Sequence, residues 1–404
     1  MRQTETFEAR GWRRTAGCTL LLILTGVCAL HAQLLSSIGD PARGERLFKD
    51  KCTRCHGADA GGTTSAPALR KAGQPRQPLE LAGLIWNHSP QMTAKARDLG
   101  VGRPVLTGAE TGDVLAYLYS LNFVDAPGNA ARGLVLLKEK KCVTCHTAGT
   151  PAPTDAPSLR DLARFGSSVA MLDAMWWHAA DMQDEMRAQQ LQRVTLNGDD
   201  MSHILTYLRS LAGSAQSAPT RLSGDAREGA KLFSVKGCNR CHAIYGYGGR
   251  IASDLGVRSL PRTPGAIAGL LWNHGSRMRQ LMERYGVPLP NFTRDELTNL
   301  VAYLYFLGFS DPAGDAARGR ALFLSRGCVR CHATRSDARA LVGPDLSRSQ
   351  AVLSPLEAAR LMWDHAPKME SKLREYGLKW PQFQHNELSD LLAYLNSLPT
   401  ASRR

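Results

Sequence analysis

Residues 52–56 read Cys-Thr-Arg-Cys-His, and this short pattern decides how the whole chain is organised. The same pattern, C-x-x-C-H, returns at 142–146, 238–242 and 328–332. Successive copies begin 90, 96 and 90 residues apart. Self-similarity at a fixed period is typical of repeated domains, so the sequence predicts four repeats of similar length.

C-x-x-C-H is the attachment motif of c-type haem, in which two cysteine sulfurs bind the porphyrin and the adjacent histidine binds the iron. A zinc ribbon would need a second cysteine pair about 15–20 residues further on, and a thioredoxin-like pair would need a βαβ setting. The chain shows neither pattern. We therefore predict four covalently bound haem c groups, held by Cys52, Cys55, His56, Cys142, Cys145, His146, Cys238, Cys241, His242, Cys328, Cys331 and His332.

Each repeat opens and closes in the same way. In the first repeat a helix start at 39–44 offers Asp40 as N-cap, and the segment 115–121 is apolar at helical spacing. The tyrosine of this closing segment recurs in every repeat, and we expect it to pack in the core: Tyr117, Tyr207, Tyr303 and Tyr394. Three repeats share a turn that leads to the closing helix, with prolines Pro104, Pro290 and Pro381. No repeat shows strand periodicity, so the predicted fold class is all-α.

The four repeats also look like two copies of a two-domain unit. Cys52 and Cys238 are 186 residues apart, and so are Cys142 and Cys328. The linker 123–133 is similar to 309–319, whereas 212–219 between repeats 2 and 3 has the composition of a flexible linker. We therefore expect repeats 1 and 2 to form one rigid pair and repeats 3 and 4 another, joined by a softer hinge.

A glycine-led helix, the C-x-x-C-H motif, a long helix with a methionine and a closing helix containing Ala-Tyr-Leu (116–118) together resemble class I cytochrome c. The resemblance covers essentially the whole mature chain and implies one compact helical domain for each haem. The implied cytochrome c domains are 33–126, 127–213, 214–310 and 311–404. The resemblance also implies that a proline carbonyl orients the haem-binding histidine. Three prolines match that position, and repeat 3 has Ser253 there instead: Pro67, Pro157 and Pro344.

Every repeat carries the pattern W-x-H-x-x-x-M at a nearly fixed distance from the haem motif, with the methionine 36, 36, 36 and 37 residues after the histidine of C-x-x-C-H. Thioether is a soft ligand suited to haem iron, and class I cytochromes place a methionine after this helix. We predict these methionines as second axial ligands: Met92, Met182, Met278 and Met369. The alternative ligands are the histidines four positions earlier: His88, His178, His274 and His365. Three residues are expected to interrupt the helix and free the methionine: Pro90, Gly275 and Pro367. Met186 and Met282 are rival candidates.

The N-terminal segment has the order of a secretory signal peptide. Arg10, Arg13 and Arg14 precede an apolar stretch at 15–30, so we assign 1–32 as a leader, with a retained membrane anchor as the alternative. We expect export to the periplasm, with an extracellular or membrane-associated location as the other possibilities. His203 and His385 have no counterparts in other repeats and are expected to face solvent.

The chain has a formal net charge of +14, which becomes +12 without the four arginines and two glutamates of the leader. Haem propionates lower this further, so the holoprotein is mildly basic. That charge suits docking to acidic redox proteins or to membrane-bound respiratory complexes. The basic residues are scattered rather than clustered, which argues against nucleic-acid binding.

Four haems in one chain predict an electron-transfer protein of the respiratory type that relays electrons and binds no small-molecule substrate. The alternative is a multihaem enzyme, a peroxidase or small-molecule reductase, with one open haem. An enzyme needs an open iron position and nearby acid–base groups, whereas every repeat supplies a candidate sixth ligand. A gas or redox sensor is a third possibility, but no signalling domain is attached.

Overall fold

The computed structural model describes residues 39–70, 77–148, 156–213, 224–258, 260–334, 342–348 and 354–398. The predicted leader at 1–32 and most of the predicted hinge at 212–219 lie outside these residues. The chain from Gly39 onward forms one compact unit. Apart from the hairpin of β1 (Ala243–Ile244) and β2 (Tyr247–Gly248), the described secondary structure is helical, which confirms the all-α prediction. Of the described helices, none is long and apolar enough to cross a membrane.

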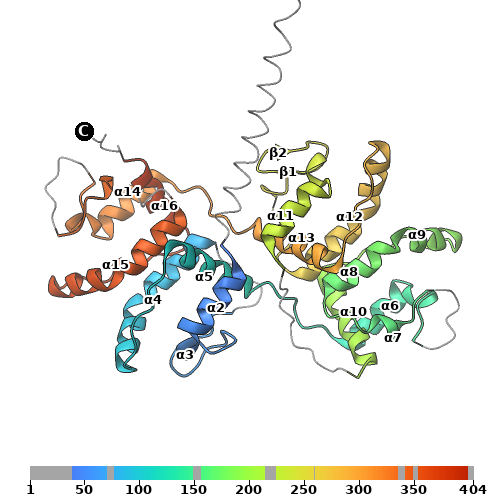
Figure 1. Cartoon of the computed structure of the whole chain (residues 1–404), viewed down its shortest axis with the longest axis horizontal. Coiled ribbons are helices and arrows are strands. Elements are labelled where there is room, and N and C mark those ends of the chain that lie inside the picture. The colour runs from blue at the N-terminus through green and yellow to red at the C-terminus, as the bar shows by residue number, and fades with distance from the viewer. Residues whose placement is uncertain are drawn as a thin grey trace, which may run out of the picture. The chain divides into compact units, whose positions relative to one another are not determined.

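The helices follow the four sequence repeats, and they are labelled in Figure 1. Repeats 1 and 2 contain α2 (Pro41–Lys51), α3 (Thr53–His56), α4 (Pro78–Asp98), α5 (Gly108–Ser120), α6 (Ala130–Glu139), η1 (Cys142–Thr144), α7 (Leu159–Leu162), α8 (Ser168–Trp177), α9 (Ala179–Ala188) and α10 (Gly198–Leu211). Repeats 3 and 4 contain α11 (Ala226–Val235), η2 (Cys238–Arg240), α12 (Pro264–Arg284), α13 (Arg294–Phe306), α14 (Ala316–Ser325), η3 (Cys328–Arg330), η4 (Leu346–Arg348), α15 (Pro355–Glu375) and α16 (Glu387–Asn396).

The first and last helices of each repeat cross at a glycine. A Cβ atom on Gly44 of α2 would lie 1.9 Å from the carbonyl oxygen of Asp113 in α5, so only glycine allows this approach. The same contact recurs in the other repeats at Gly133, Gly229 and Gly319. Beside the crossing, Tyr117 is buried with its ring 5.2 Å from Phe48. The glycine therefore sets the helix crossing, and the tyrosine packs in the core of repeat 1 as predicted.

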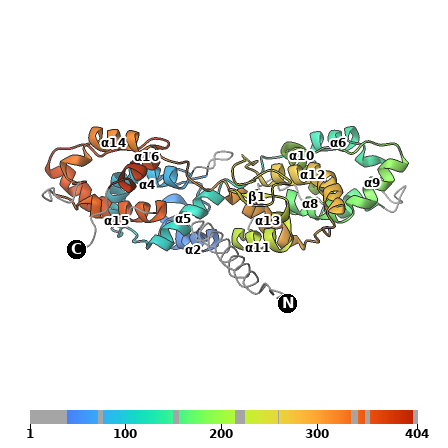
Figure 2. The same ribbon diagram turned by 90° about the horizontal axis from the view of Figure 1, so that it is seen from above.

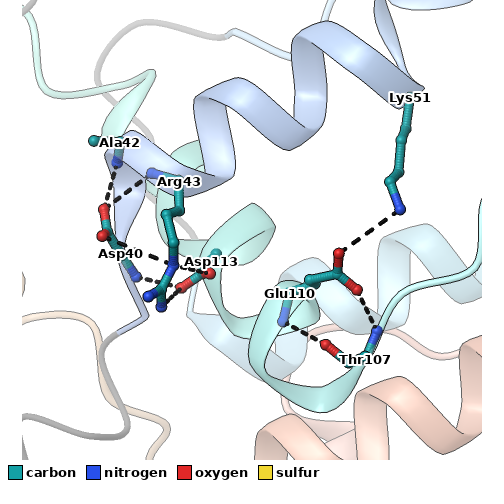
Figure 3. A network of polar contacts seen from close by, with 7 residues as sticks. All are labelled: Asp40, Ala42, Arg43, Lys51, Thr107, Glu110 and Asp113. Carbon is teal, nitrogen blue, oxygen red and sulfur yellow. Dashed lines mark hydrogen bonds and ion pairs between the residues drawn. The ribbon is translucent and has the colours of Figure 1, made fainter.

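A polar network fixes the start of α2 against α5 (Figure 3). Asp40 caps α2 by accepting from the backbone N–H groups of its first turn, which confirms the predicted N-cap. The guanidinium of Arg43 donates two hydrogen bonds to the buried carboxylate of Asp113, at 2.8 and 3.0 Å. At the other end of α2, Lys51 lies 3.7 Å from Glu110 in the first turn of α5. The two helices are thus joined at both ends.

The residue equivalent to Asp113 differs among the repeats but always accepts from the backbone N–H of the residue that caps the first helix, as Asp113 does from Asp40 at 2.6 Å. Asp390 of repeat 4 binds Arg318 in the same two-bonded way. In repeat 2 the equivalent residue is His203, whose Nδ1 accepts from the backbone N–H of Asn129 at 2.8 Å. His203 is half-buried, so the expectation that it faces solvent is wrong, whereas His385 is exposed as expected.

The repeats pack in pairs that differ from the sequence prediction. Helices α4 and α5 of repeat 1 contact α15 of repeat 4, and α8 and α10 of repeat 2 contact α12 of repeat 3. Figures 1 and 2 show α15 beside α4, and α12 beside α8. The expectation that repeats 1 and 2, and repeats 3 and 4, form the rigid pairs is therefore wrong. Repeat 1 corresponds to repeat 3, and repeat 2 to repeat 4, in the duplicated sequence. The contact of repeat 1 with repeat 4 is therefore equivalent to the contact of repeat 3 with repeat 2.

Polar side chains of the long helices explain this pairing. Asn87 of α4 donates to the carbonyl of Phe383 and accepts from its backbone N–H, at 2.7 and 2.8 Å. Asn273 of α12, 186 positions later, makes the same two bonds with Leu196 of repeat 2. A buried backbone group without a partner is costly, so each asparagine holds a segment of another repeat in place.

Candidate haem sites

Each C-x-x-C-H motif forms a single helical turn. The backbone N–H of the histidine donates to the carbonyl of the first cysteine in all four copies, at 2.9–3.0 Å. Residues three and four apart on a turn lie on one face. In repeat 1 this geometry places the side chains of Cys52, Cys55 and His56 together. The fold thus presents two thiols and one imidazole to the same space in every repeat.

The first cysteine of each motif lies in an apolar environment. In repeat 1, Cys52 packs against a core that includes Phe48 and Leu118. Burial raises the pKa of this thiol to about 11. The equivalent thiols have the same pKa for the same reason: Cys142, Cys238 and Cys328. Partly buried Leu81 and Ile85 of α4 pack against the same core. An apolar wall beside the thiols and the imidazole fits a porphyrin, which presents wide apolar faces.

The motif histidines are oriented by backbone carbonyls. Nδ1 lies 3.3, 2.8, 2.9 and 3.1 Å from the carbonyl oxygens of Pro67, Pro157, Ser253 and Pro344 in repeats 1 to 4. A carbonyl can only accept, so Nδ1 carries the proton and Nε2 is left as the ligand atom. Such contacts orient metal-binding histidines. The three prolines make the contact that the resemblance implied, and Ser253 supplies it in repeat 3 because the group used is a backbone carbonyl.

A second histidine faces the motif histidine in every repeat. The ring centroids of His242 and His274 are 6.4 Å apart, and those of His332 and His365 are 6.2 Å apart. In repeat 1 burial, with a smaller contribution from His88, lowers the pKa of His56. Burial, followed by the facing histidine, lowers the pKa of His178, His274 and His365. These second histidines come from the W-x-H-x-x-x-M pattern.

The methionines of that pattern lie on the same helices, one turn beyond the second histidine, and all four are half-buried: Met92, Met182, Met278 and Met369. The rival candidates Met186 and Met282 lie a further turn along. Helices α4, α12 and α15 run without a break through Pro90, Gly275 and Pro367. The expectation that these residues interrupt the helix is therefore wrong. The break occurs instead in repeat 2, where His178 separates α8 from α9.

The helices continue through proline because other repeats supply the missing hydrogen bonds. A proline leaves the carbonyl four residues earlier without its helical donor. Pro90 frees the carbonyl of Trp86, which accepts from the indole N–H of Trp380 at 3.1 Å. Pro367 frees the carbonyl of Trp363, which accepts from Arg103 at 3.2 Å. Contacts between repeats 1 and 4 thus stabilise the long helices beside the sites.

The tryptophans of the pattern are contact residues that sequence reasoning missed. The indole N–H of Trp86 donates to the carbonyl of Pro381 at 2.7 Å, and that of Trp363 donates to Pro104 at 2.9 Å. Trp86 also stacks on Trp380, with ring centroids 4.3 Å apart. The sequence does contain a signal for these contacts, the proline repeated in the turn before the closing helix. In the structure the carbonyl of this proline accepts from the indole N–H of a tryptophan in another repeat.

Within the described ranges, no three His, Cys, Asp or Glu side chains come together to hold a metal ion by themselves. The candidate metal ligands of the described sites are the histidines of the C-x-x-C-H turns and the second histidines near them. Two thiols, an oriented imidazole and an apolar wall form a donor set that fits haem c in each repeat.

Comparison with known proteins gives two matches. Residues 41–122 match the protein-family model described as Cytochrome c, which spans α2 to α5. The Cbb3-type cytochrome c oxidase subunit FixP of Bradyrhizobium diazoefficiens is 28% identical over 187 residues, covering 43% of this chain and 58% of FixP. The chain thus spans less than two thirds of that relative. No solved structure matches at a significant level. The matches support a cytochrome c domain with covalent haem c and a role in electron transfer.

Proposed function

We propose that this chain is a tetrahaem c-type cytochrome, an electron carrier that relays electrons between redox partners through four covalently bound haems. One observation carries the proposal: the same donor set recurs in all four repeats. In each, a C-x-x-C-H turn holds a histidine whose Nδ1 contacts a backbone carbonyl, and in repeats 3 and 4 the ring of this histidine also lies about 6 Å from that of a second histidine. The residues of these sites are the twelve motif residues, from Cys52 to His332.

Bound haem supplies a one-electron couple, and the protein holds it and tunes its potential. The motif cysteines fix the ring, and the carbonyl-bound imidazole fixes the ligand tautomer. In repeat 1 the apolar side chains packed around Cys52 and Ile85 keep water from the bound haem. No proton transfer or bond cleavage in a substrate is assigned to these residues.

The repeat contacts suggest which haems exchange electrons most directly. The helices α4 and α15 carry the facing histidines of repeats 1 and 4, and these helices pack on each other. The helix α12 of repeat 3 packs in the same way on α8 of repeat 2. We therefore propose that haems 1 and 4 form one exchanging pair and haems 2 and 3 the other.

The proposed partners are redox proteins or membrane-bound respiratory complexes. FixP is named as a subunit of a cbb3-type oxidase, and its likeness to this chain supports a respiratory setting. The mildly basic charge suits acidic partner surfaces. Because 1–32 has the pattern of a secretory signal peptide, we propose a periplasmic location.

The proposal is tested by producing the full chain in a host that attaches haem c and counting haems per chain. Replacing both cysteines of one motif by alanine should lower the count by one, for each of the four motifs. Arg330→Lys lies inside the fourth motif but keeps its cysteines and histidine, so it should retain the wild-type count. A cysteine variant that keeps every haem would contradict attachment at that motif.

A redox titration followed by absorbance tests the carrier role. The account predicts that all haems are reduced reversibly and exchange electrons quickly with small redox proteins. Peroxide, cyanide and carbon monoxide should leave the spectrum nearly unchanged. Rapid binding of one of these molecules, together with turnover of peroxide or another small substrate, would favour the enzyme alternative.

A further inference from the structure

In repeats 3 and 4 two imidazoles lie close together with their planes tilted by 50° and 49°, and this geometry distinguishes between the possible sixth ligands. The ring centroids are 6.4 Å apart in repeat 3 and 6.2 Å apart in repeat 4. Metal–imidazole bonds are about 2.0 Å long, so two imidazoles on opposite sides of one iron would place their ring centroids roughly 6 Å apart. The observed separations agree with a shared iron between the two rings.

In repeat 1 the second histidine also has the tautomer of a metal ligand. In repeat 1, Nδ1 of His88 lies 2.9 Å from the carbonyl oxygen of Leu84, one turn earlier on α4. Because a carbonyl only accepts, Nδ1 carries the proton and Nε2 is free to bind metal. The motif histidine His56 is held in the same way by Pro67. Both imidazoles of repeat 1 therefore have the tautomer of a metal ligand.

The methionine lies in a different place along the helix. It is four residues after the second histidine, which at about 1.5 Å per residue is roughly 6 Å further along the axis. In repeats 1, 3 and 4 the helices α4, α12 and α15 continue through this region, so no loop returns the thioether to the level of the histidine. One iron can therefore meet the histidine or the methionine, and the ring separations favour the histidine.

We propose that each haem has two histidine ligands: His274 and His365 on the ring separations of repeats 3 and 4, and, at the same place in the W-x-H-x-x-x-M pattern, His88 and His178 in repeats 1 and 2. The inference rests on the proposed haem c attachment and replaces the methionine ligands expected from the sequence. Methionine–histidine ligation raises the potential of a c-type haem. Two-histidine ligation therefore gives four haems of lower potential than the class I cytochromes that the sequence resembles.

The test uses the full holoprotein and spectra of its oxidised form. The proposal predicts low-spin haem without the charge-transfer band of methionine-bound ferric iron. Leucine should leave this spectrum and the reduction potentials unchanged when it replaces each methionine in turn: Met92→Leu, Met182→Leu, Met278→Leu and Met369→Leu. A methionine band in the wild type, lost in one of these variants, would overturn the proposal for that haem.

The matched variants are His88→Ala, His178→Ala, His274→Ala and His365→Ala. Each should convert one of the four haems to a high-spin form that binds carbon monoxide, and added imidazole should restore the low-spin spectrum. Low-spin haem that persists without imidazole would contradict the proposal. If a histidine variant does not fold, the wild-type spectrum and the methionine variants still decide the ligand. Haem counting separates the two proposals, because fewer than four haems contradicts the function, whereas four haems with methionine bands contradicts only the ligation.

Discussion

Tyr119 and Tyr305 bind each other's backbone through two reciprocal hydrogen bonds. The hydroxyl of Tyr119 donates to the carbonyl of Tyr305 at 3.4 Å, and the hydroxyl of Tyr305 donates to the carbonyl of Tyr119 at 3.0 Å. The two residues are 186 positions apart, which is the offset between the two halves of the sequence. Equivalent residues of repeats 1 and 3 thus meet each other, and the duplication visible in the sequence reappears as a self-complementary contact.

We expect the Tyr119→Phe substitution to weaken this contact. It removes one of the two donors to the carbonyl of Tyr305, which keeps its bond from the backbone N–H of Gly308 at 3.1 Å. The free energy of unfolding should therefore fall by about 0.5–1.5 kcal/mol, the net contribution of one hydrogen bond. The measurement is chemical denaturation of the holoprotein. Tyr285 is 53% exposed, so Tyr285→Phe serves as control and should change stability by less than about 0.5 kcal/mol. Equal stability of the two variants would show that the reciprocal bonds contribute nothing.

The pairing of repeats 1 and 4 depends on Asn87. Replacing it by alanine removes both bonds to the backbone of Phe383, and each buried group left unpaired costs about 1–3 kcal/mol. We expect Asn87→Ala to lower the unfolding midpoint and to increase hydrogen exchange around 381–383. Asn273→Ala should have the same effect on 194–196 in repeat 2. The exposed Asn291→Ala should have neither, and an identical exchange pattern in all three variants would contradict the assigned contacts.

The helix crossings require glycine. A Cβ atom at position 229 would lie 2.0 Å from the carbonyl oxygen of Asn299. Forcing extra atoms into a packed contact costs about 1–3 kcal/mol or more, so Gly229→Ala should lower the free energy of unfolding by at least that amount. A Cβ atom on Gly102 would meet no other atom within 4 Å, so Gly102→Ala is the matched control. The measurement is thermal unfolding. If Gly229→Ala unfolds at the same temperature as the wild type, α11 and α13 can move apart without loss of stability, which would contradict this prediction.

Asp311 gives the contact between repeats 1 and 4 a dependence on pH. Its carboxylate accepts from the backbone N–H of Leu79 at 2.8 Å, and burial raises its pKa to about 6. Because the folded pKa lies above the unfolded one, this group stabilises the fold most when it is protonated. Its contribution is complete below pH about 4 and is lost as the pH rises through about 6.

Asp311→Asn keeps an oxygen that can accept from Leu79 and removes the charge. We expect this variant to have a flatter stability profile between pH 4 and 7 and a higher unfolding midpoint at pH 7 than the wild type. The measurement is thermal unfolding across this range. Asp295, which is exposed in the first turn of α13, provides the control substitution Asp295→Asn. Parallel profiles for the wild type and Asp311→Asn would contradict a raised pKa.

Much of each repeat could be predicted from sequence because the relevant interactions are local. The C-x-x-C-H turn, the Asp40 cap and the apolar closing segment are defined within a few residues of each other. The carbonyl that orients His56 lies 11 residues away. For the same reason, an aspartate before a helical segment could be assigned as an N-cap without knowledge of the rest of the fold.

The pairing of repeats and the course of the long helices depend on distant residues. The partner of Asn87 is 296 residues away, and the donor that replaces the hydrogen bond lost at Pro90 is Trp380. Local rules predict a helix break at such a proline, and only the contact with another repeat removes it. Methionine is predicted as the second ligand partly because a helix break at Pro90 would free it, and the contact that removes this break lies in another repeat.

The ratio of covalently bound haem to protein tests the central claim most directly. The holoprotein is denatured, unbound porphyrin is removed, and the intact chain is weighed by mass spectrometry. The account predicts the mass of the mature chain plus four haem groups, with each haem located on the peptide that contains one C-x-x-C-H motif. A fully matured chain that carries three haems or fewer, or haem that separates from the denatured protein, would contradict it.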